Sequence, residues 1–147
     1  MTDTKSPITL FLAPLVIPVT GPMICDAAIA VSDGHILHVG TRDWMAEKLY
    51  EERGEGLADC EVLRWNGLIT PGLVNAHTHL QYTGMASVGK GSYDCFRSWE
   101  LAFNAIYDDP APKPWRAWAH EGARKLVESG TTAAADVVSD LEAADAL

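Results

Sequence analysis

The sequence predicts an α/β protein with two parts: a small β-rich part over residues 1–67, and the first βα units of a parallel series over residues 68–147. Two observations carry this prediction. In the first part, apolar runs alternate with turn dipeptides, which is typical of short strands. In the second part, segments with helical periodicity separate two strand-like runs, and strands connected in this way pair in parallel.

The first part opens with "LFLAPLVIPV", which predicts one or two short strands whose prolines suit strand ends. Asp33-Gly34 then separates two apolar-rich runs, and this dipeptide is a strong hairpin signal. His35 and His38 fall on the second strand of that hairpin. They point to opposite faces of a regular strand and therefore cannot share one metal ion. We interpret both as surface or loosely buried side chains.

A short helix is predicted over "TRDWMAEKLYEERG", where Thr41 suits the N-cap and Gly54 lies beyond the end. Trp44, Met45 and Leu49 would form its buried stripe. The segment "CEVLRWNG" then predicts a further strand and a turn.

The second part contains a glycine-bearing segment, "MASVGKGSYD", which we expect to be a loop. The next segment, "CFRSWELAFNAIY", places four large apolar residues at helical spacing and predicts a helix. These residues are Phe96, Trp99, Phe103 and Ile106.

The clearest helix in the chain is expected to start at Pro114 and to stop at Gly130. Glu121 and Lys125 can pair on its outer face. His120 falls on the polar side and is interpreted as exposed rather than catalytic. "TTAAADVVSD" then predicts a second strand, and "DLEAADAL" the start of another helix. The apolar face of the long helix would comprise Trp115, Trp118, Ala119, Gly122, Ala123, Leu126 and Val127.

Composition excludes several classes of partner. The net charge of −9 and the absence of a basic stripe argue against binding to nucleic acid, which needs clustered Lys and Arg. No run approaches the ~20 apolar residues of a membrane-spanning helix, so no membrane association is expected. Pro14 and Pro18 interrupt the apolar N-terminal run and argue against a secretory leader. Three isolated cysteines favour a reducing compartment, the cytoplasm: Cys25, Cys60 and Cys95.

The segment "TPGLVNAHTHLQ" carries the candidate chemistry. His77 and His79 occupy positions i and i+2, so a strand would present both imidazoles on one side, at a separation suited to binding one cation. Spacing alone is a weak signal, because such pairs also occur by chance. If the strand continued, Gln81 would point the same way, and Tyr82 follows it. Both could touch a substrate, although Gln81 could equally be a polar residue in a loop.

The longer string "ITPGLVNAHTHL" closely resembles the first-strand signature of the amidohydrolase superfamily, in the branch of cytosine-deaminase-like and guanine-deaminase-like aminohydrolases. The hairpin "IAVSDGHILHVG" and the turn Ser129–Thr132 also resemble that family. The resemblance implies the start of a distorted eight-stranded (β/α) barrel, preceded by a small β-rich domain of the composite β-sandwich type. Only the first two barrel strands fit in this chain, because a full barrel takes ~250 residues.

The resemblance also implies the chemistry. One divalent metal ion, zinc in preference to iron, would bind to His77 and His79. The metal would activate water to attack a carbon that bears nitrogen in a small-molecule substrate, with release of ammonia or an amine. Gln81 and Tyr82 would bind substrate. The family's remaining ligands and acid–base groups come from later strands, so no catalytic residue is assigned in this chain.

We therefore expect an N-terminal fragment of a longer enzyme that is inactive alone and whose full-length parent could form a homo-oligomer. Deamination of a purine-like or pyrimidine-like ring is the favoured reaction. Hydrolysis of another C–N or a C–Cl bond by the same machinery is the first alternative. The second alternative is a non-catalytic β-rich module in which the histidine pair is structural or binds metal adventitiously.

Overall fold

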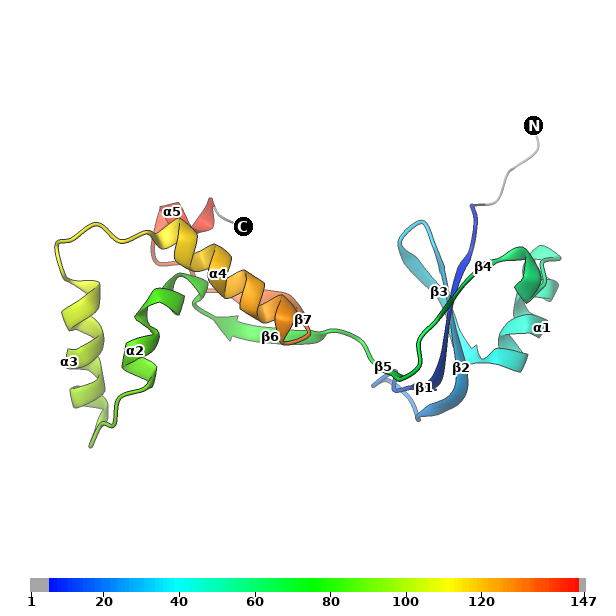
Figure 1. Ribbon diagram of the computed structural model, residues 1–147, viewed down its shortest axis with the longest axis horizontal. Coiled ribbons are helices and arrows are strands. Elements are labelled where there is room, and N and C mark those ends of the chain that lie inside the picture. The colour runs from blue at the N-terminus through cyan, green and yellow to red at the C-terminus, as the bar shows by residue number, and fades with distance from the viewer. Residues whose placement is uncertain (1–5, 146–147) are drawn as a thin grey trace. The chain divides into compact units, whose positions relative to one another are not determined.

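The computed structural model describes residues 6–145 of this mixed α/β chain (Figure 1). The chain divides into two compact units, residues 1–71 and residues 72–147. Among the described residues, no helix is long and apolar enough to cross a lipid bilayer.

The first unit is built on a five-stranded sheet in the order β3-β2-β1-β4, in which β5 also pairs with β1. Strand β1 is antiparallel to β2 but parallel to β4 and β5. The sequence analysis placed Leu68–Ile69 in the second part, whereas the structure pairs these residues with Leu15 and Val16. The elements are β1 (Thr9–Val16), β2 (Ile24–Ser32), β3 (His35–Thr41), α1 (Arg42–Arg53), η1 (Leu57–Asp59), β4 (Glu61–Arg64) and β5 (Leu68–Ile69).

The turn between β2 and β3 confirms the predicted hairpin. Asp33 has a φ of 50° and Gly34 a φ of 74°. Both residues are in the left-handed region, as a two-residue turn of type I′ requires. The antiparallel pairing of β2 with β3 follows directly from this turn.

Helix α1 also forms as predicted. The Thr41 hydroxyl accepts a hydrogen bond from the backbone N–H of Trp44, and Gly54 closes the helix at a φ of 70°. Met45 and Leu49 are fully buried, but Trp44 is 42% exposed, so the expected stripe of three residues is wrong at Trp44. The Trp44 ring instead lies over Gly40, where an added Cβ would come within 2.4 Å of it. The buried cluster beneath α1 comprises Ile8, Leu10, Leu12, Ala28, Ala30, Met45 and Leu49.

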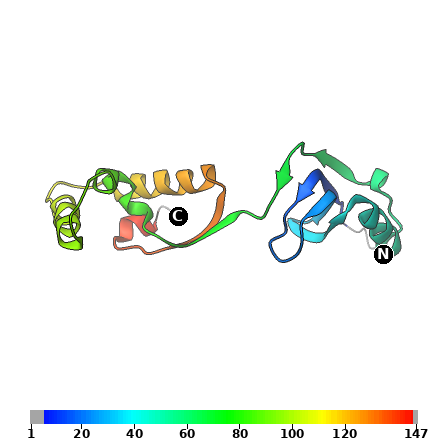
Figure 2. The ribbon, with the colours of Figure 1, turned by 90° about the horizontal axis from the view of Figure 1, so that it is seen from below.

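The second unit contains a two-stranded parallel sheet with helices between and after its strands. Helix α4 runs alongside the strands in both views (Figures 1 and 2) and packs against β7. The expected loop over residues 85–94 is wrong at residues 85–89, where the chain is helical. The elements are β6 (Leu73–Thr78), η2 (Leu80–Met85), α2 (Ala86–Gly89), α3 (Phe96–Tyr107), α4 (Trp115–Glu128), β7 (Thr131–Asp136) and α5 (Leu141–Ala144).

The core of this unit holds η2 against α4. Gly122 allows the close approach, because a Cβ at this position would lie 2.9 Å from the carbonyl oxygen of Leu80. The α4 residues Trp115 and Ala119 are buried here, together with Leu80 and Met85. This contact fixes the chain immediately after the end of β6.

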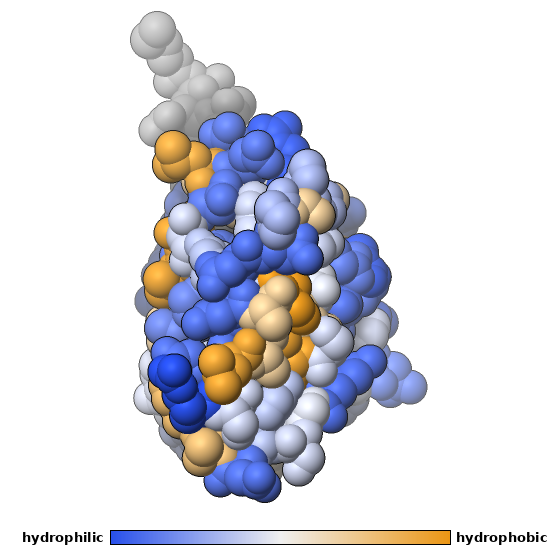
Figure 3. All heavy atoms as spheres, turned by 90° about the vertical axis from the view of Figure 1, so that its left-hand side faces the viewer, coloured by the Kyte–Doolittle hydropathy of each residue, from blue (hydrophilic) through white to orange (hydrophobic). Residues whose placement is uncertain are grey.

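Other apolar side chains of the second unit are left uncovered. On β6, Leu73 is 60% exposed and Val74 is 72% exposed. Helix α3 buries none of its residues, and Phe96 and Leu101 are exposed on it. Figure 3 views the side of the molecule on which α3 lies, and hydrophobic residues (orange) are visible there among polar ones.

The hairpin turn generates a stability prediction. Gly34→Ala should lower the free energy of unfolding by about 1–2 kcal/mol, because alanine is strained at a left-handed φ. Nothing lies within 4 Å of the added methyl group, so no steric contact contributes. Gly21→Ala is the matched control: its Cβ would make an ordinary contact of 3.9 Å with Pro18, and its φ is not left-handed. Urea unfolding of the full chain measures both variants, and equal stabilities would contradict the prediction.

Candidate metal centre

The two motif histidines lie at the carboxyl end of β6. His77 is inside the strand, and His79 is one residue beyond its last residue, Thr78. Because β6 and β7 are parallel, this end lies beside the carboxyl end of β7, and Thr78 pairs with Asp136. His77 is exposed and His79 is half-buried. Both imidazoles are therefore within reach of solvent or of a ligand.

The two rings lie close together. The His77 and His79 ring centroids are 5.0 Å apart, with an angle of 79° between the ring planes. Two imidazoles that bind one zinc ion tetrahedrally through nitrogens at about 2.0–2.1 Å have their centroids about 5 Å apart. The rings thus have the separation that one shared cation requires.

A backbone hydrogen bond sets the tautomer of His79. Its Nδ1 lies 2.9 Å from the carbonyl oxygen of Val137. A carbonyl oxygen only accepts, so Nδ1 carries the proton and donates it. The lone pair of neutral His79 is then on Nε2, the nitrogen left for a metal. A ring N–H donated to a backbone carbonyl is the usual support of a metal-binding histidine.

Tyr82 and Ser139 complete the surroundings of His79. The Tyr82 ring stacks on the His79 ring, with centroids 5.1 Å apart and an interplanar angle of 21°. The Tyr82 hydroxyl donates a hydrogen bond to Ser139 Oγ at 3.0 Å. Tyr82 belongs to η2, whereas Ser139 follows β7, so the contact again joins the segments after the two strands.

Asp136 ties the same two segments together through the backbone. Its Oδ1 accepts a hydrogen bond from the N–H of Leu80 at 2.8 Å, and the N–H of Val137 donates to the carbonyl of Thr78 at 2.8 Å. The sequence analysis gave no role to Asp136, Val137 or Ser139. The expected parallel pairing was the signal that could have found them, because it brings the residues after both strands together.

Gln81 does not occupy the position that the sequence analysis expected. The strand does not continue past Thr78; at His79 the backbone has φ −132° and ψ 81°, and η2 follows. Gln81 therefore lies inside the unit and is 0% exposed. Neither polar atom of its amide has a hydrogen-bond partner among the described residues. Its substrate-binding role, like that of Tyr82, stays a prediction.

The remaining histidines lie elsewhere. His38 Nε2 is 2.7 Å from Glu52 Oε2, and His35 Nδ1 is 2.8 Å from the carbonyl oxygen of Asp33, both within the first unit. His120 is exposed on α4, as expected. Over residues 6–145, no cluster of three or more His, Cys, Asp or Glu side chains could hold a metal ion. His77 and His79 thus fit two positions of a metal site, and this part of the chain does not supply a third.

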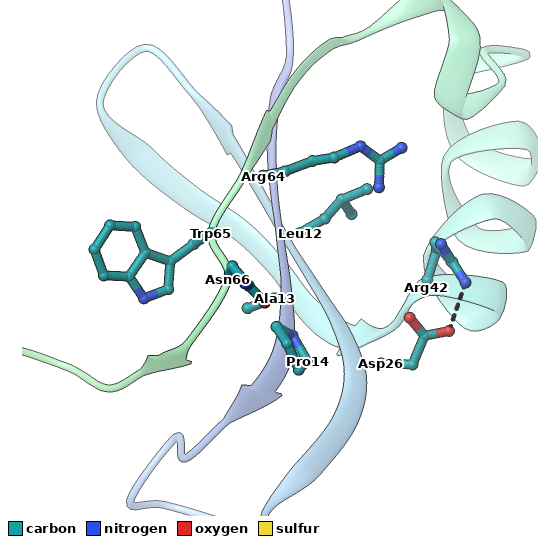
Figure 4. A pocket seen from close by; sticks show the side chains of 8 residues that line it. All are labelled: Leu12, Ala13, Pro14, Asp26, Arg42, Arg64, Trp65 and Asn66. Carbon is teal, nitrogen blue, oxygen red and sulfur yellow. Dashed lines mark hydrogen bonds and ion pairs between the residues drawn. The ribbon is translucent and has the colours of Figure 1, made fainter.

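A hollow in the first unit contains neither motif histidine (Figure 4). Its volume is about 450 Å³. Arg42 and Asp26 neutralise each other there at 2.9 Å, and Arg64 and Trp65 point in opposite directions. No set of polar groups converges, so we assign it no part in the chemistry. The hollow is lined by Leu12, Ala13, Pro14, Asp26, Arg42, Arg64, Trp65 and Asn66.

The buried amide of Gln81 generates a prediction about stability. Gln81→Met should raise the free energy of unfolding by about 1–3 kcal/mol, because it removes a buried polar group that has no partner. Methionine is also flexible enough to fill the vacated space. Thermal or urea unfolding of the full chain measures the change. A loss of stability would show that the amide has a hydrogen-bond partner in the folded chain.

The chain is similar to known proteins in both sequence and structure. No family profile matches the chain. In sequence, it is similar to the imidazolonepropionase of Shewanella woodyi, with 46% identity over 67 residues that cover 42% of this chain and 14% of that protein.

In structure, the chain is similar to a triazine hydrolase variant, with a TM-score of 0.67 and 19% identity over 90% of this chain and 29% of that one. It is also similar to an adenosine deaminase from Xanthomonas campestris with bound zinc, with a TM-score of 0.58 and 20% identity over 88% of this chain and 28% of that one. The chain thus spans less than a third of the length of each of these proteins. They are members of the amidohydrolase superfamily. The motif around His77 and His79 indicates a resemblance to that superfamily, and this resemblance is confirmed.

Proposed function

We propose that this chain forms the first part of a metal-dependent hydrolase in which His77 and His79 bind one divalent metal ion. The observation that carries the proposal is the geometry of the pair. The rings are 5.0 Å apart, and the hydrogen bond from His79 Nδ1 to Val137 leaves Nε2 free for the metal.

The proposal includes the fold of the complete protein. Strands β6 and β7, with the helices between them, would be the first two strands of a (β/α) barrel. Their parallel pairing supports this, as does the structural similarity to much longer hydrolases. The histidines then lie at the carboxyl end of the first strand, the end at which barrel enzymes carry their active sites.

Zinc is the favoured metal. Neutral imidazole nitrogens suit zinc well, and one of the similar structures holds zinc. When bound, the ion would supply a water whose pKa is lowered toward about 7 and which is therefore a nucleophile at neutral pH. His77 and His79 would hold the ion, and both must be neutral to do so. The carbonyl of Val137 keeps the proton of His79 on Nδ1, away from the metal.

The favoured reaction is hydrolysis of a C–N bond of a small nitrogen heterocycle: water would add to the carbon and ammonia would leave, which is deamination. The names of the similar proteins support this substrate class, because imidazolone, triazine and adenosine all contain a nitrogen heterocycle. Hydrolysis of a different C–N or a C–Cl bond would use the same machinery.

The proposed compartment is the cytoplasm. Cys25, Cys60 and Cys95 are free thiols, which supports a reducing compartment of this kind.

Because residues 6–145 supply only two ligands, we propose that these residues alone do not turn over substrate. Catalytic zinc sites typically use three protein ligands and keep the fourth position for water. The further ligands would have to come from residues other than those described.

The ligand roles can be tested by zinc titration of the full chain. His77→Ala and His79→Ala should each weaken zinc binding by at least about tenfold, because each removes one of two ligands. His120→Ala is the matched control and should bind zinc like the unmodified chain, since His120 is exposed on α4. Competition with a chromogenic chelator measures the affinities. Unchanged affinity in either motif variant, or an equal loss in the control, would refute the assignment.

A further inference from the structure

We infer that Tyr82 is a positioning residue for the metal ligand His79: together with Ser139 and Val137, it holds the imidazole in the orientation that presents Nε2. The inference rests on the proposed function only in that it takes His79 as the ligand. It assigns Tyr82 a role different from the substrate contact that the sequence analysis predicted.

The first step is the number of constraints on the His79 ring. Its Nδ1 donates to the carbonyl of Val137 at 2.9 Å, which fixes one edge of the ring. Tyr82 stacks on its face at 5.1 Å with an angle of 21° between the planes. Rotation of the imidazole about its Cβ–Cγ bond would break the hydrogen bond and turn the ring out of the stack. The pair of contacts therefore selects one ring orientation.

The second step is that Tyr82 is itself held in place. Its hydroxyl donates to Ser139 Oγ at 3.0 Å. Its ring meets Phe103 edge-on at 5.0 Å and lies 6.1 Å from Tyr107 and 6.4 Å from Trp115. Aromatic pairs in such arrangements stabilise the folded state beyond the burial of their area. Tyr82 is thus a rigid support rather than a freely rotating side chain.

The third step is that the hydroxyl proton and the ring of Tyr82 are already engaged by neighbouring residues. The hydroxyl is engaged by Ser139, and the ring contacts His79, Phe103 and the aromatic residues behind it. In metal sites, groups that orient a ligand in this way affect metal affinity by about 10–100-fold when they are removed. Metal affinity rises when the imidazole is held in its binding orientation before the metal binds, because the ring then loses less rotational freedom on binding.

The first measurement follows the tautomer of His79 in the metal-free chain. Long-range ¹H–¹⁵N NMR correlations of the imidazole should show the proton on Nδ1 in the unmodified protein. Tyr82→Ala should give averaged nitrogen shifts, like those of the exposed His120 in the same spectrum. Tyr50→Ala, which removes an exposed tyrosine of α1, is the control and should leave His79 unchanged. An averaged tautomer in the unmodified chain, or an unchanged one in Tyr82→Ala, would overturn the inference.

The second measurement is zinc affinity, which also covers the case in which Tyr82→Ala does not fold. Tyr82→Ala should bind zinc about tenfold more weakly. Tyr82→Phe keeps the stacked ring and loses only the hydrogen bond to Ser139, so a loss of about threefold is expected. Ser139→Ala removes the same bond from an exposed position and should give the same loss. The double variant should be no weaker than either single one, because both remove one interaction.

The outcomes separate the two proposals. If His79→Ala leaves zinc binding unchanged, the ligand role fails, while the tautomer measurement still tests the support of the ring by Tyr82. If His79→Ala abolishes binding but Tyr82→Phe and Ser139→Ala bind zinc like the unmodified chain, the ligand role stands and the positioning role is overturned. Additive losses in the double variant would also overturn it, since the two side chains would then act separately.

Discussion

The parallel pairing of β6 with β7 is the constraint on which the candidate centre depends. Hydrogen bonds bracket the pair at both ends: the N–H of Leu73 donates to the carbonyl of Gly130, and that of Val137 donates to the carbonyl of Thr78, each at 2.8 Å. The two carboxyl ends are therefore level. Apart from His77 within β6, the groups described in contact with His79 come from the short segments that leave these two ends: Tyr82 after β6 and Val137 after β7. If the pairing were lost, the histidines would remain neighbours in sequence, but the groups that orient them would be gone.

The features that could be predicted from sequence are those encoded by residues close together in the chain. The left-handed turn at Asp33-Gly34, the hydroxyl cap of Thr41 and the stop at Gly130 each depend on one local conformation, and each residue type suits that conformation. The closeness of the His77 and His79 rings, whose centroids are 5.0 Å apart, also agrees with a local rule, the alternation of side chains along a strand. The structure agrees with sequence reasoning at these points because nothing distant competes with the local preference.

The features that could not be predicted depend on contacts between distant residues. The carbonyl that sets the tautomer of His79 lies 58 positions away in the sequence. Gln81 was expected to share the side of the ligands, but the backbone leaves the strand at His79, and the following turn buries the side chain instead. Trp44 has the spacing of a core residue, yet it lies over Gly40, because a glycine there leaves room for the indole. In each case packing decides the outcome, and periodicity carries no information about it.

The buried polar atoms that lack a hydrogen-bond partner bear on the proposed function. Among residues 6–145, three buried side-chain atoms lack a hydrogen-bond partner: the two amide atoms of Gln81 and Oδ2 of Asp136. Asp136 is the last residue of β7, and Gln81 lies in η2, the segment that follows β6. Buried polar groups without partners are costly, and natural proteins tolerate them chiefly where function requires them. Asp136 uses its other carboxylate oxygen to bind the N–H of Leu80, the residue before Gln81, so the segments that follow the two strands meet at these polar groups. The metal centre proposed at this end of the strand pair would account for retaining them there.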